Sequence, residues 1–187
     1  MRVISGNFKG KKILEPKDIK TRPLKDLTKE SIFNIIKHSN KFKVSIENSV
    51  VLDLFSGVGS FGLECISRGA KHVTFVENYG KVLPILKKNL FNTSNSKSYE
   101  IVEKNILDGI TFKEITRKFD IVFLDPPYKD KNLQKILLNI FNEKITFKKT
   151  IFIIHRHKKE KDFYPENFRI LDEKSYGISK IIFGTLN

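Results

Sequence analysis

Four consecutive residues, Asp125, Pro126, Pro127 and Tyr128, form the most specific chemical motif in the chain. They follow the apolar run 120–124, which predicts a buried strand. Since two prolines cannot continue a central strand or a helix, we expect a rigid loop at the carboxyl end of that strand, where parallel sheets bind ligands. The Asp125 carboxylate and the Pro126 carbonyl are suited to accept both N–H groups of an exocyclic amine on a nucleobase, and Tyr128 is suited to stack on the base. Because these contacts free the nitrogen lone pair, the four residues are the predicted catalytic residues of an amino-methylation.

A glycine-rich turn lies upstream of this motif. Residues 50–54 predict a buried parallel strand, and Gly57, Gly59 and Gly62 follow with the spacing of a nucleotide-binding turn that opens a helix. The spacing alone fits either a dinucleotide or S-adenosylmethionine. Asp53 favours S-adenosylmethionine, because a carboxylate repels a pyrophosphate and attracts a sulfonium and an ammonium.

Two further predicted strand ends supply polar groups to the same edge. Glu77 follows the glycine turn at the distance expected for an acid that accepts both ribose hydroxyls; the alternative is a solvated acid at a strand end. Asn105 offers a donor and an acceptor to an adenine edge, or else it caps the following helix. The predicted cofactor-binding residues are Asp53, Phe55, Gly57, Gly59, Glu77, Asn78, Asn105 and Ile106.

The balance of charge predicts a polyanionic partner. The 187 residues carry a formal net charge of +14, which favours RNA or DNA, although an AT-rich genome would also raise the lysine content. Residues 2–14 resemble a small hairpin with a basic tip around Phe8. Arg156, at the end of a predicted strand, is interpreted as a further contact. The predicted RNA-binding residues are Lys9, Lys11, Lys12, Lys20, Arg22 and Arg156.

Other features exclude several classes of protein. The single cysteine, Cys65, cannot form an internal disulfide and suits a reducing cytosol. His155 and His157 lie close together, but no further ligands accompany them, so we expect no metal site. The basic first residues lack the apolar segment of a signal peptide, and no apolar run is long enough to span a membrane. These features predict a cytoplasmic protein, which we expect to be a monomer.

The order of predicted elements indicates an α/β fold. Strands are predicted at 50–54, 73–77, 98–103, 120–124, 150–154, 168–173 and 178–184, and helices at 60–68, 80–91, 107–117 and 130–142. This alternation predicts a mostly parallel sheet with helices on both faces, and the last two strands are joined too closely for a helix. A Rossmann-like seven-stranded sheet ending in an antiparallel hairpin is the class I methyltransferase variant of the fold. We expect an extension at 1–48 that consists of a basic hairpin and a helix, and this helix should begin at Pro23 with Thr21 as its cap. The methyltransferase domain is expected at 49–187.

The chain resembles the bacterial RsmD-like methyltransferases. The matching segments are 2–6, 8–12, Thr21-Arg22-Pro23, 29–34, 52–64, 67–70, Asp125-Pro126-Pro127-Tyr128 and Tyr176-Gly177, so the similarity runs nearly end to end. The resemblance implies S-adenosylmethionine as methyl donor and N2 of a guanine in 16S ribosomal RNA as target. It also implies a substrate presented on the small ribosomal subunit or its assembly intermediate.

Several positions depart from the pattern of that family, and other functions are open. Leu24 and Leu27 replace a threonine and a basic residue, and His155-Arg156 stands where the fifth strand usually ends in an acid. These departures affect the RNA contacts more than the methyl transfer. The alternatives are a DNA adenine or cytosine amino-methyltransferase, a protein-glutamine methylase, a non-catalytic RNA-binding module on the same fold and an NAD oxidoreductase.

Overall fold

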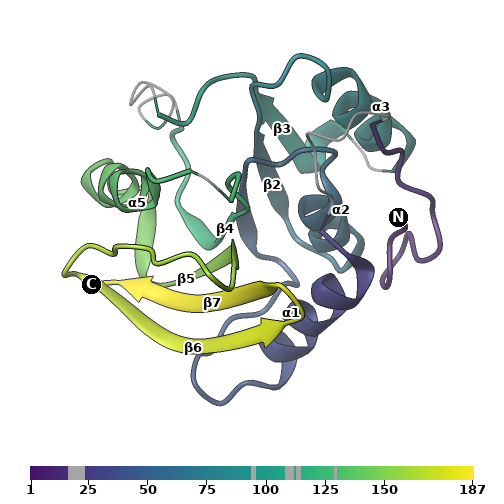
Figure 1. The fold of residues 1–187 in the computed structure, drawn as a ribbon. Helices are drawn as coiled ribbons and strands as arrows, with labels where there is room; N and C mark the ends of the chain where they lie inside the picture. Colours follow the sequence, from purple (N-terminus) through teal and green to yellow (C-terminus); the bar gives the residue numbers. More distant parts are fainter. Residues whose placement is uncertain (17–23, 94–95, 108–111, 113–114, 129) are drawn as a thin grey trace.

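The computed structural model describes residues 1–187 except 17–23, 94–95, 108–111, 113–114 and 129. Its centre is a seven-stranded sheet in the order β3-β2-β1-β4-β5-β7-β6 (Figure 1). The strands are β1 (Val50–Leu54), β2 (His72–Val76), β3 (Tyr99–Val102), β4 (Phe119–Leu124), β5 (Thr146–His157), β6 (Phe168–Tyr176) and β7 (Ser179–Leu186). The first five strands are parallel, and β7 runs antiparallel to both β5 and β6. The predicted sheet with a terminal antiparallel hairpin is confirmed.

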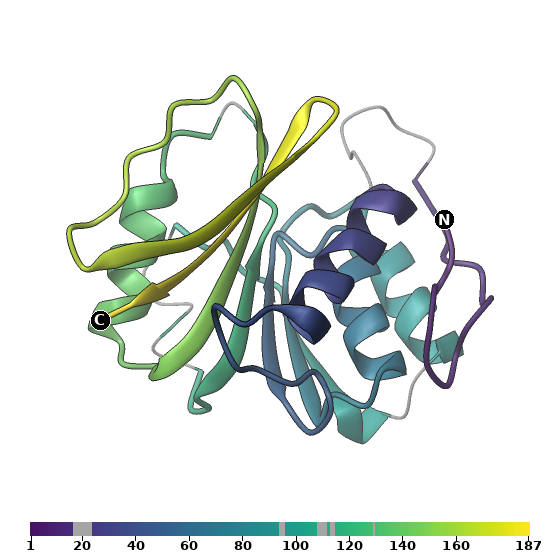
Figure 2. The ribbon, with the colours of Figure 1, turned by 90° about the horizontal axis from the view of Figure 1, so that it is seen from below.

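Helices cover both faces of this sheet, as predicted. On one face lie α1 (Asp26–His38), α2 (Ser60–Ser67) and α3 (Leu83–Thr93), and on the other lies α5 (Leu133–Asn142) (Figure 2). The strands β1 and β4 carry buried side chains toward both layers, because successive residues of a strand point to opposite faces. Val51 and Ile121 belong to the core under α2, whereas Leu52 and Val122 belong to the core under α5.

Helix boundaries differ from the predictions by a few residues. α3 begins at Leu83 rather than at residue 80, because the chain first makes a turn in which Val82 donates to the Tyr79 carbonyl. α5 begins at Leu133, because the Asp130 carboxylate accepts the N–H of Asn132 and holds the preceding turn. Most of the helix predicted at 107–117 lies outside the described residues.

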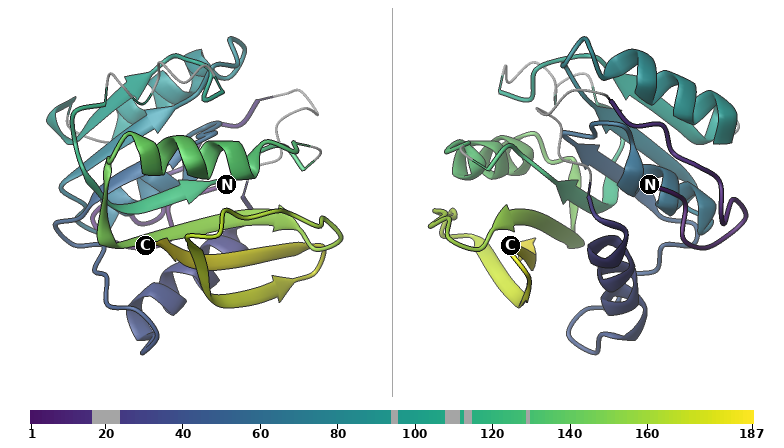
Figure 3. Two further views of the ribbon diagram at one scale, coloured as in Figure 1. Left: turned by 90° about the vertical axis from the view of Figure 1, so that its left-hand side faces the viewer. Right: turned by 45° about the vertical axis from the view of Figure 1, so that its right-hand side comes forward.

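α1 packs beside the antiparallel end of the sheet, whereas α3 lies beside β2 and β3 (Figure 3). Phe42, just after α1, stacks on Phe183 of β7 with ring centroids 5.4 Å apart. The observed helix begins at Asp26. The predicted opening at Thr21 and Pro23 lies outside the described residues.

The segment 1–16 folds back on itself and lies against α2 and α3. Arg2 and Lys12 form an antiparallel bridge, which confirms a short hairpin. Near its tip, the main-chain N–H groups of Asn7 and Phe8 donate to the carbonyl and hydroxyl of Ser67, the last residue of α2. The tip therefore lies at the end of α2 away from the carboxyl edge of the sheet, and the β6–β7 turn lies at the opposite end of the molecule (Figure 2).

The extension and the sheet share one core. Val3 and Ile13 of the hairpin and Ile32 of α1 belong to the same buried cluster as Val51 of β1. The boundary proposed at residue 48 thus separates segments that pack together. Within the described part of the chain, no helix has the length and apolar character needed to cross a membrane.

Candidate active site

The turn after β1 has the backbone geometry of a close-approach loop. Gly57 and Gly59 have φ of 55° and 84°, and Phe55 has φ of 59°, which L side chains rarely adopt. A Cβ at Gly59 would lie 2.6 Å from a methyl group of Leu86, so glycine is required there for space as well as for conformation. A non-glycine residue with positive φ beside two such glycines is typical of a backbone shaped for a ligand.

Asp53 lies beneath the start of α2 rather than facing solvent. It is 1 % exposed, and its Oδ2 accepts the N–H of Gly62 at 2.9 Å. Its Oδ1 is buried and has no hydrogen-bond partner among the described residues. Burial raises the pKa of Asp53 well above its ordinary range, and the nearby carboxylates of Asp125 and Glu77 raise it further. The raised pKa disfavours the ionised form, so it weakens the argument that a charged Asp53 repels a pyrophosphate.

Replacement of Asp53 by asparagine should raise stability in a pH-dependent way. Because the pKa of Asp53 is higher in the folded protein, its carboxyl group loses its proton at lower pH in the unfolded chain than in the folded one. The free energy of unfolding therefore decreases as pH rises above about 4, the ordinary pKa of the group. We expect the Asp53→Asn protein to exceed the wild type in free energy of unfolding at neutral pH, with a difference that shrinks as pH falls toward 4. Urea unfolding across this range measures it. Asp120→Asn, on the adjacent strand β4, is the control, and a difference that instead shrinks with rising pH would contradict the assignment.

Glu77, at the end of β2, closes the glycine turn. Its carboxylate accepts main-chain N–H groups from Gly57 at 2.8 Å, Asn78 at 2.9 Å and Tyr79 at 2.8 Å. The side chain is buried, so the alternative of a solvated acid at a strand end is wrong. One lone pair of Oε2 is not used by these three bonds, since each carboxylate oxygen accepts about two. A ribose hydroxyl therefore has an acceptor at this point.

Asn105, after β3, forms a local turn. Its Oδ1 accepts the N–H of Leu107 at 3.1 Å, which closes a turn of the Asx type. The helix that Asn105 was alternatively predicted to cap lies mostly outside the described residues. The neighbouring Ile106 is buried in the core under α5. The side-chain amide of Asn105 remains a candidate for the base of a cofactor.

These residues fit S-adenosylmethionine. The turn has no side chain at Gly57 and Gly59, and Glu77 presents an acceptor at the expected strand end. The buried Oδ1 of Asp53 has no partner in the part of the chain that the structure describes. No group of three or more metal-ligating side chains occurs among the residues that the structure describes.

Asp125 is brought directly to this turn. Its main-chain N–H donates to the carbonyl of Leu54, the residue before Phe55, at 3.3 Å. Its side chain is 19 % exposed, and Oδ1 lies 2.8 Å from Nδ1 of His155 on β5. The two motifs predicted from the sequence thus meet at one edge of the sheet. The sequence alone did not indicate the contact with His155, because it depends on the register of β4 against β5.

The loop after Asp125 is held by a buried arginine. Arg156 is fully buried; its Nη1 donates to the Pro127 carbonyl at 3.1 Å and its Nη2 to the Asp130 carbonyl at 2.8 Å. Its Nε donates to Asp162 at 2.9 Å, and that carboxylate is 4 % exposed. The prediction that Arg156 contacts RNA is therefore corrected: its donors already serve the catalytic loop and a buried ion pair.

Tyr128 is partly buried beside two histidines. Its ring lies nearly perpendicular to those of His155 and His157, with centroids 5.9 and 5.3 Å away. Its hydroxyl is 3.3 Å from Oγ of Ser179, the first residue of β7. Pro126 is buried and Pro127 is exposed. The ring is thus oriented by the β5–β7 end of the sheet, next to Asp125.

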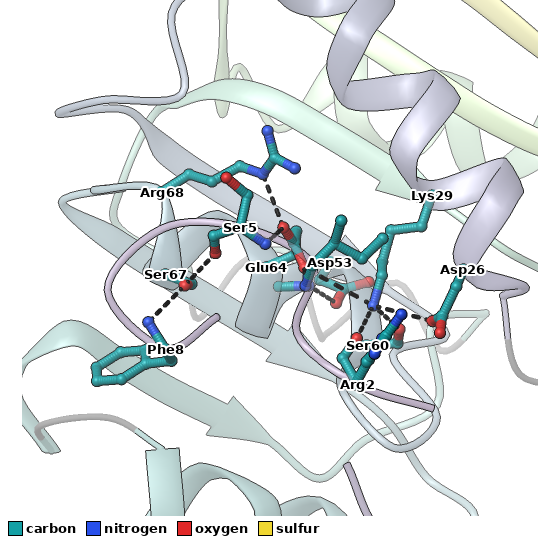
Figure 4. A network of polar contacts seen from close by, with 12 residues as sticks. Arg2, Ser5, Phe8, Asp26, Lys29, Asp53, Ser60, Glu64, Ser67 and Arg68 are labelled. Atoms are coloured by element: carbon teal, nitrogen blue, oxygen red, sulfur yellow. Dashed lines mark hydrogen bonds and ion pairs between the residues drawn. The ribbon is translucent and has the colours of Figure 1, made fainter. Parts of the chain in front are cut away.

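A buried ion-pair network joins the hairpin and α1 to α2 (Figure 4). Lys29 of α1 is fully buried; its Nζ donates to the Arg2 carbonyl and the Ser60 hydroxyl and lies 3.8 Å from Glu64. Burial lowers the pKa of Lys29, although Glu64 opposes that shift. The sequence offered one signal that was missed: Lys29 lies beside Thr28 and Ile32 on the buried stripe of α1.

The basic residues predicted to bind RNA are distributed unevenly. Lys9, Lys11 and Lys12 are exposed on the hairpin, and Lys11 lies 5.0 Å above the Phe8 ring and donates to the carbonyl of Asn92 near the end of α3. The hairpin tip is bonded to the last residue of α2, an eight-residue helix about 12 Å long whose other end begins at the glycine turn. Lys20 and Arg22 lie outside the described residues.

A parallel sheet that ends in an antiparallel hairpin, with a glycine turn after β1 and Asp125 after β4, defines a class I methyltransferase. A putative methyltransferase, yhhF, of Escherichia coli has the same fold, with a TM-score of 0.82 and 23 % identity over 100 % of this chain and 98 % of that one.

The chain belongs to the family described as Conserved hypothetical protein 95, which matches residues 1–185. It is 35 % identical to ribosomal RNA small subunit methyltransferase D of Haemophilus influenzae, over 95 % of this chain and 90 % of that protein. It is 34 % identical to the putative rRNA methyltransferase YlbH of Bacillus subtilis, over 97 % of this chain and 96 % of that protein. The resemblance stated from the sequence is confirmed.

Proposed function

We propose that this enzyme transfers a methyl group from S-adenosylmethionine to the exocyclic N2 amine of a guanine in small-subunit ribosomal RNA, in the cytoplasm. The observation that carries the proposal is the hydrogen bond from the Asp125 main chain to the Leu54 carbonyl. It supports the proposal because it brings Asp125 next to the glycine turn. Two relatives named as rRNA methyltransferases, each matched over nearly the full chain, support an RNA substrate.

The cofactor would be held at the turn and at the ends of β2 and β3. The proposed residues are Asp53, Phe55, Gly57, Gly59, Glu77, Asn78, Asn105 and Ile106. When bound, S-adenosylmethionine supplies an electrophilic methyl group. Glu77 accepts a ribose hydroxyl, and the buried Oδ1 of Asp53 is an acceptor for a cationic group, which would favour its ionised form.

The target amine would be held by the loop after β4. Asp125 and the Pro126 carbonyl accept its two N–H groups, and Tyr128 stacks on the base. Pro127 is not assigned an acceptor role, because its carbonyl already accepts from Arg156 and from the main chain of Asp130. The amine nitrogen would then have its lone pair available to the methyl group that the cofactor supplies, with the methyl–sulfur bond breaking as the methyl–nitrogen bond forms and the demethylated cofactor leaving. Asp125 would take the proton that the methylated amine releases.

The positive charge of the hairpin extends the proposed RNA contact. The net charge of +14 is complementary to a phosphate backbone. Lys9, Lys11 and Lys12 are exposed on the hairpin, whose tip is bonded to the end of α2 that lies away from the catalytic edge. An RNA that reaches both places must run along the layer of α2 and α3. This surface therefore suits a folded RNA better than a single nucleotide.

Replacement of Lys9, Lys11 and Lys12 by alanine should weaken RNA binding and its salt dependence. Loss of three phosphate contacts lowers the slope of log affinity against log salt by about 2, at about 0.7 per single-strand phosphate. Filter binding of small-subunit RNA at several salt concentrations measures this slope. A triple variant at the exposed Lys135, Lys148 and Lys149 is the control, and an equal slope in both triple variants would reject the hairpin as a contact.

The function is tested by transfer of a labelled methyl group. Small-subunit particles, assembly intermediates, free ribosomal RNA, DNA and protein are each offered as acceptor, and the modified nucleotide is mapped. We expect label in small-subunit RNA, on the N2 amine of one guanine. Label in DNA alone would support an amino-methyltransferase of DNA, and binding of RNA without transfer to any acceptor would support a non-catalytic module.

A further inference from the structure

His155 makes the only side-chain contact to the Asp125 carboxylate found among the described residues. The Nδ1 of His155 lies 2.8 Å from Oδ1 of Asp125, and the His155 side chain is only 9 % exposed. The position is fixed by the sheet, because His155 pairs with Ile181 of β7 and therefore sits between β4 and the terminal hairpin. A buried ring held by two neighbouring strands has little freedom to leave the carboxylate.

The hydrogen-bond inventory of the ring selects one tautomer. Asp125 must accept at Oδ1, so the proton lies on Nδ1, and Nε2 is buried without a partner among the described residues. With the proton on Nδ1, Nε2 has only a lone pair left unsatisfied, whereas a proton on Nε2 would leave a buried donor unpaired. His157 has the opposite requirement, because its Nδ1 accepts the main-chain N–H of Lys159 at 3.1 Å.

We propose that His155 is a positioning residue for methyl transfer: by donating from Nδ1 to one oxygen of Asp125, it fixes the carboxylate so that the other oxygen accepts the target amine. This inference rests on the proposed function. This hydrogen bond also explains why a histidine at the end of β5 is compatible with an amine-binding carboxylate after β4. Tyr128, in contact with the same ring, is oriented by the same residue.

Two substitutions of His155 distinguish the role of its N–H donor from the role of its ring. His155→Asn retains an N–H donor near the position of Nδ1 but loses the ring, and His155→Phe retains ring packing against Tyr128 but loses the donor. We expect His155→Phe to lower kcat by about 10- to 100-fold with KM for RNA unchanged, since a misplaced catalytic group costs that much. His155→Asn should recover most of kcat. The reverse order, an active Phe variant and an inactive Asn variant, would show that the ring serves packing alone and would overturn the proposal.

Nitrogen NMR of labelled histidine tests the contact without activity. We expect the proton of His155 on Nδ1 and that of His157 on Nε2, and Asp125→Asn should change the shifts of His155 while His157 changes less. A proton of His155 on Nε2 would overturn the proposal. If the wild type shows the expected shifts but transfers no methyl group to any RNA, the proposed function fails while the hydrogen bond to Asp125 stands.

Discussion

Asp125→Ala is expected to lower kcat for methyl transfer by about 10³-fold while leaving the affinity for S-adenosylmethionine within about tenfold. The carboxylate contacts the target amine in the proposed arrangement, whereas the cofactor is held by the turn after β1 and by Glu77. Its own side-chain partner is His155 at 2.8 Å, so the substitution removes one hydrogen bond of the fold. Single-turnover transfer to small-subunit RNA and calorimetric titration with the cofactor measure the two quantities.

Asp120→Ala is the matched control for this prediction. Asp120 lies on the same strand at the opposite end, and its carboxylate accepts the N–H of Val50 at 3.0 Å. Its loss should cost about 1 kcal/mol of stability and little activity. Full activity of Asp125→Ala would remove the proposed mechanism, and a loss of cofactor affinity as large as the loss of kcat would reassign Asp125 to the cofactor site.

Glu64→Ala should reduce the free energy of unfolding by about 3–5 kcal/mol, the usual cost of breaking a buried ion pair. The carboxylate accepts main-chain N–H groups of Ile4 at 2.7 Å and Ser5 at 2.9 Å, and the Nε of Arg68 at 2.8 Å. It also faces Lys29, whose buried ammonium would lose its nearest fully buried countercharge. Urea unfolding measures the change, and hydrogen exchange in residues 2–15 should rise because the hairpin loses its anchor.

Removal of both charges tests the origin of this loss. The double variant Lys29→Met, Glu64→Leu leaves no uncompensated ion in the core, so we expect it to be more stable than Glu64→Ala alone. Glu30→Ala, an exposed acid on the same helix as Lys29, is the control and should change stability by less than about 0.5 kcal/mol. A Glu64→Ala protein as stable as this control would show that the network does not hold the hairpin.

The sheet was predictable because its strands are short apolar runs that end at residues with evident chemistry. β1 and β4 were placed at Val50–Leu54 and within one residue of Phe119–Leu124, and both active-site motifs follow them directly. The strand β5 proved longer than the predicted 150–154, since it starts at Thr146, before its apolar part, and continues through His157 in its pairing with β7. Alternation of residue type could not reveal that pairing, which depends on a strand later in the chain.

The roles of charged residues were harder to predict than their locations. Arg156 resembled a surface contact but is fully buried, because oxygen acceptors from the loop after β4 and from Asp162, just after β5, meet its donors. Asp53 lies near the end of β1, as expected, yet burial raises its pKa and so weakens the charge argument that was based on it. Sequence spacing places a carboxylate at a strand end, whereas its charge depends on how deeply tertiary packing covers it.

The attachment of the first residues imposes an order on folding. Ile4 and Ser5 are bound by Glu64, and Leu14 is bound by Asn89, at separations of 59 to 75 residues. During synthesis the hairpin therefore has no docking surface until α2 and α3 have been made, and closing so long a loop is slow compared with forming a local turn. The hairpin is consequently expected to be a late-folding element, although it is translated before both helices.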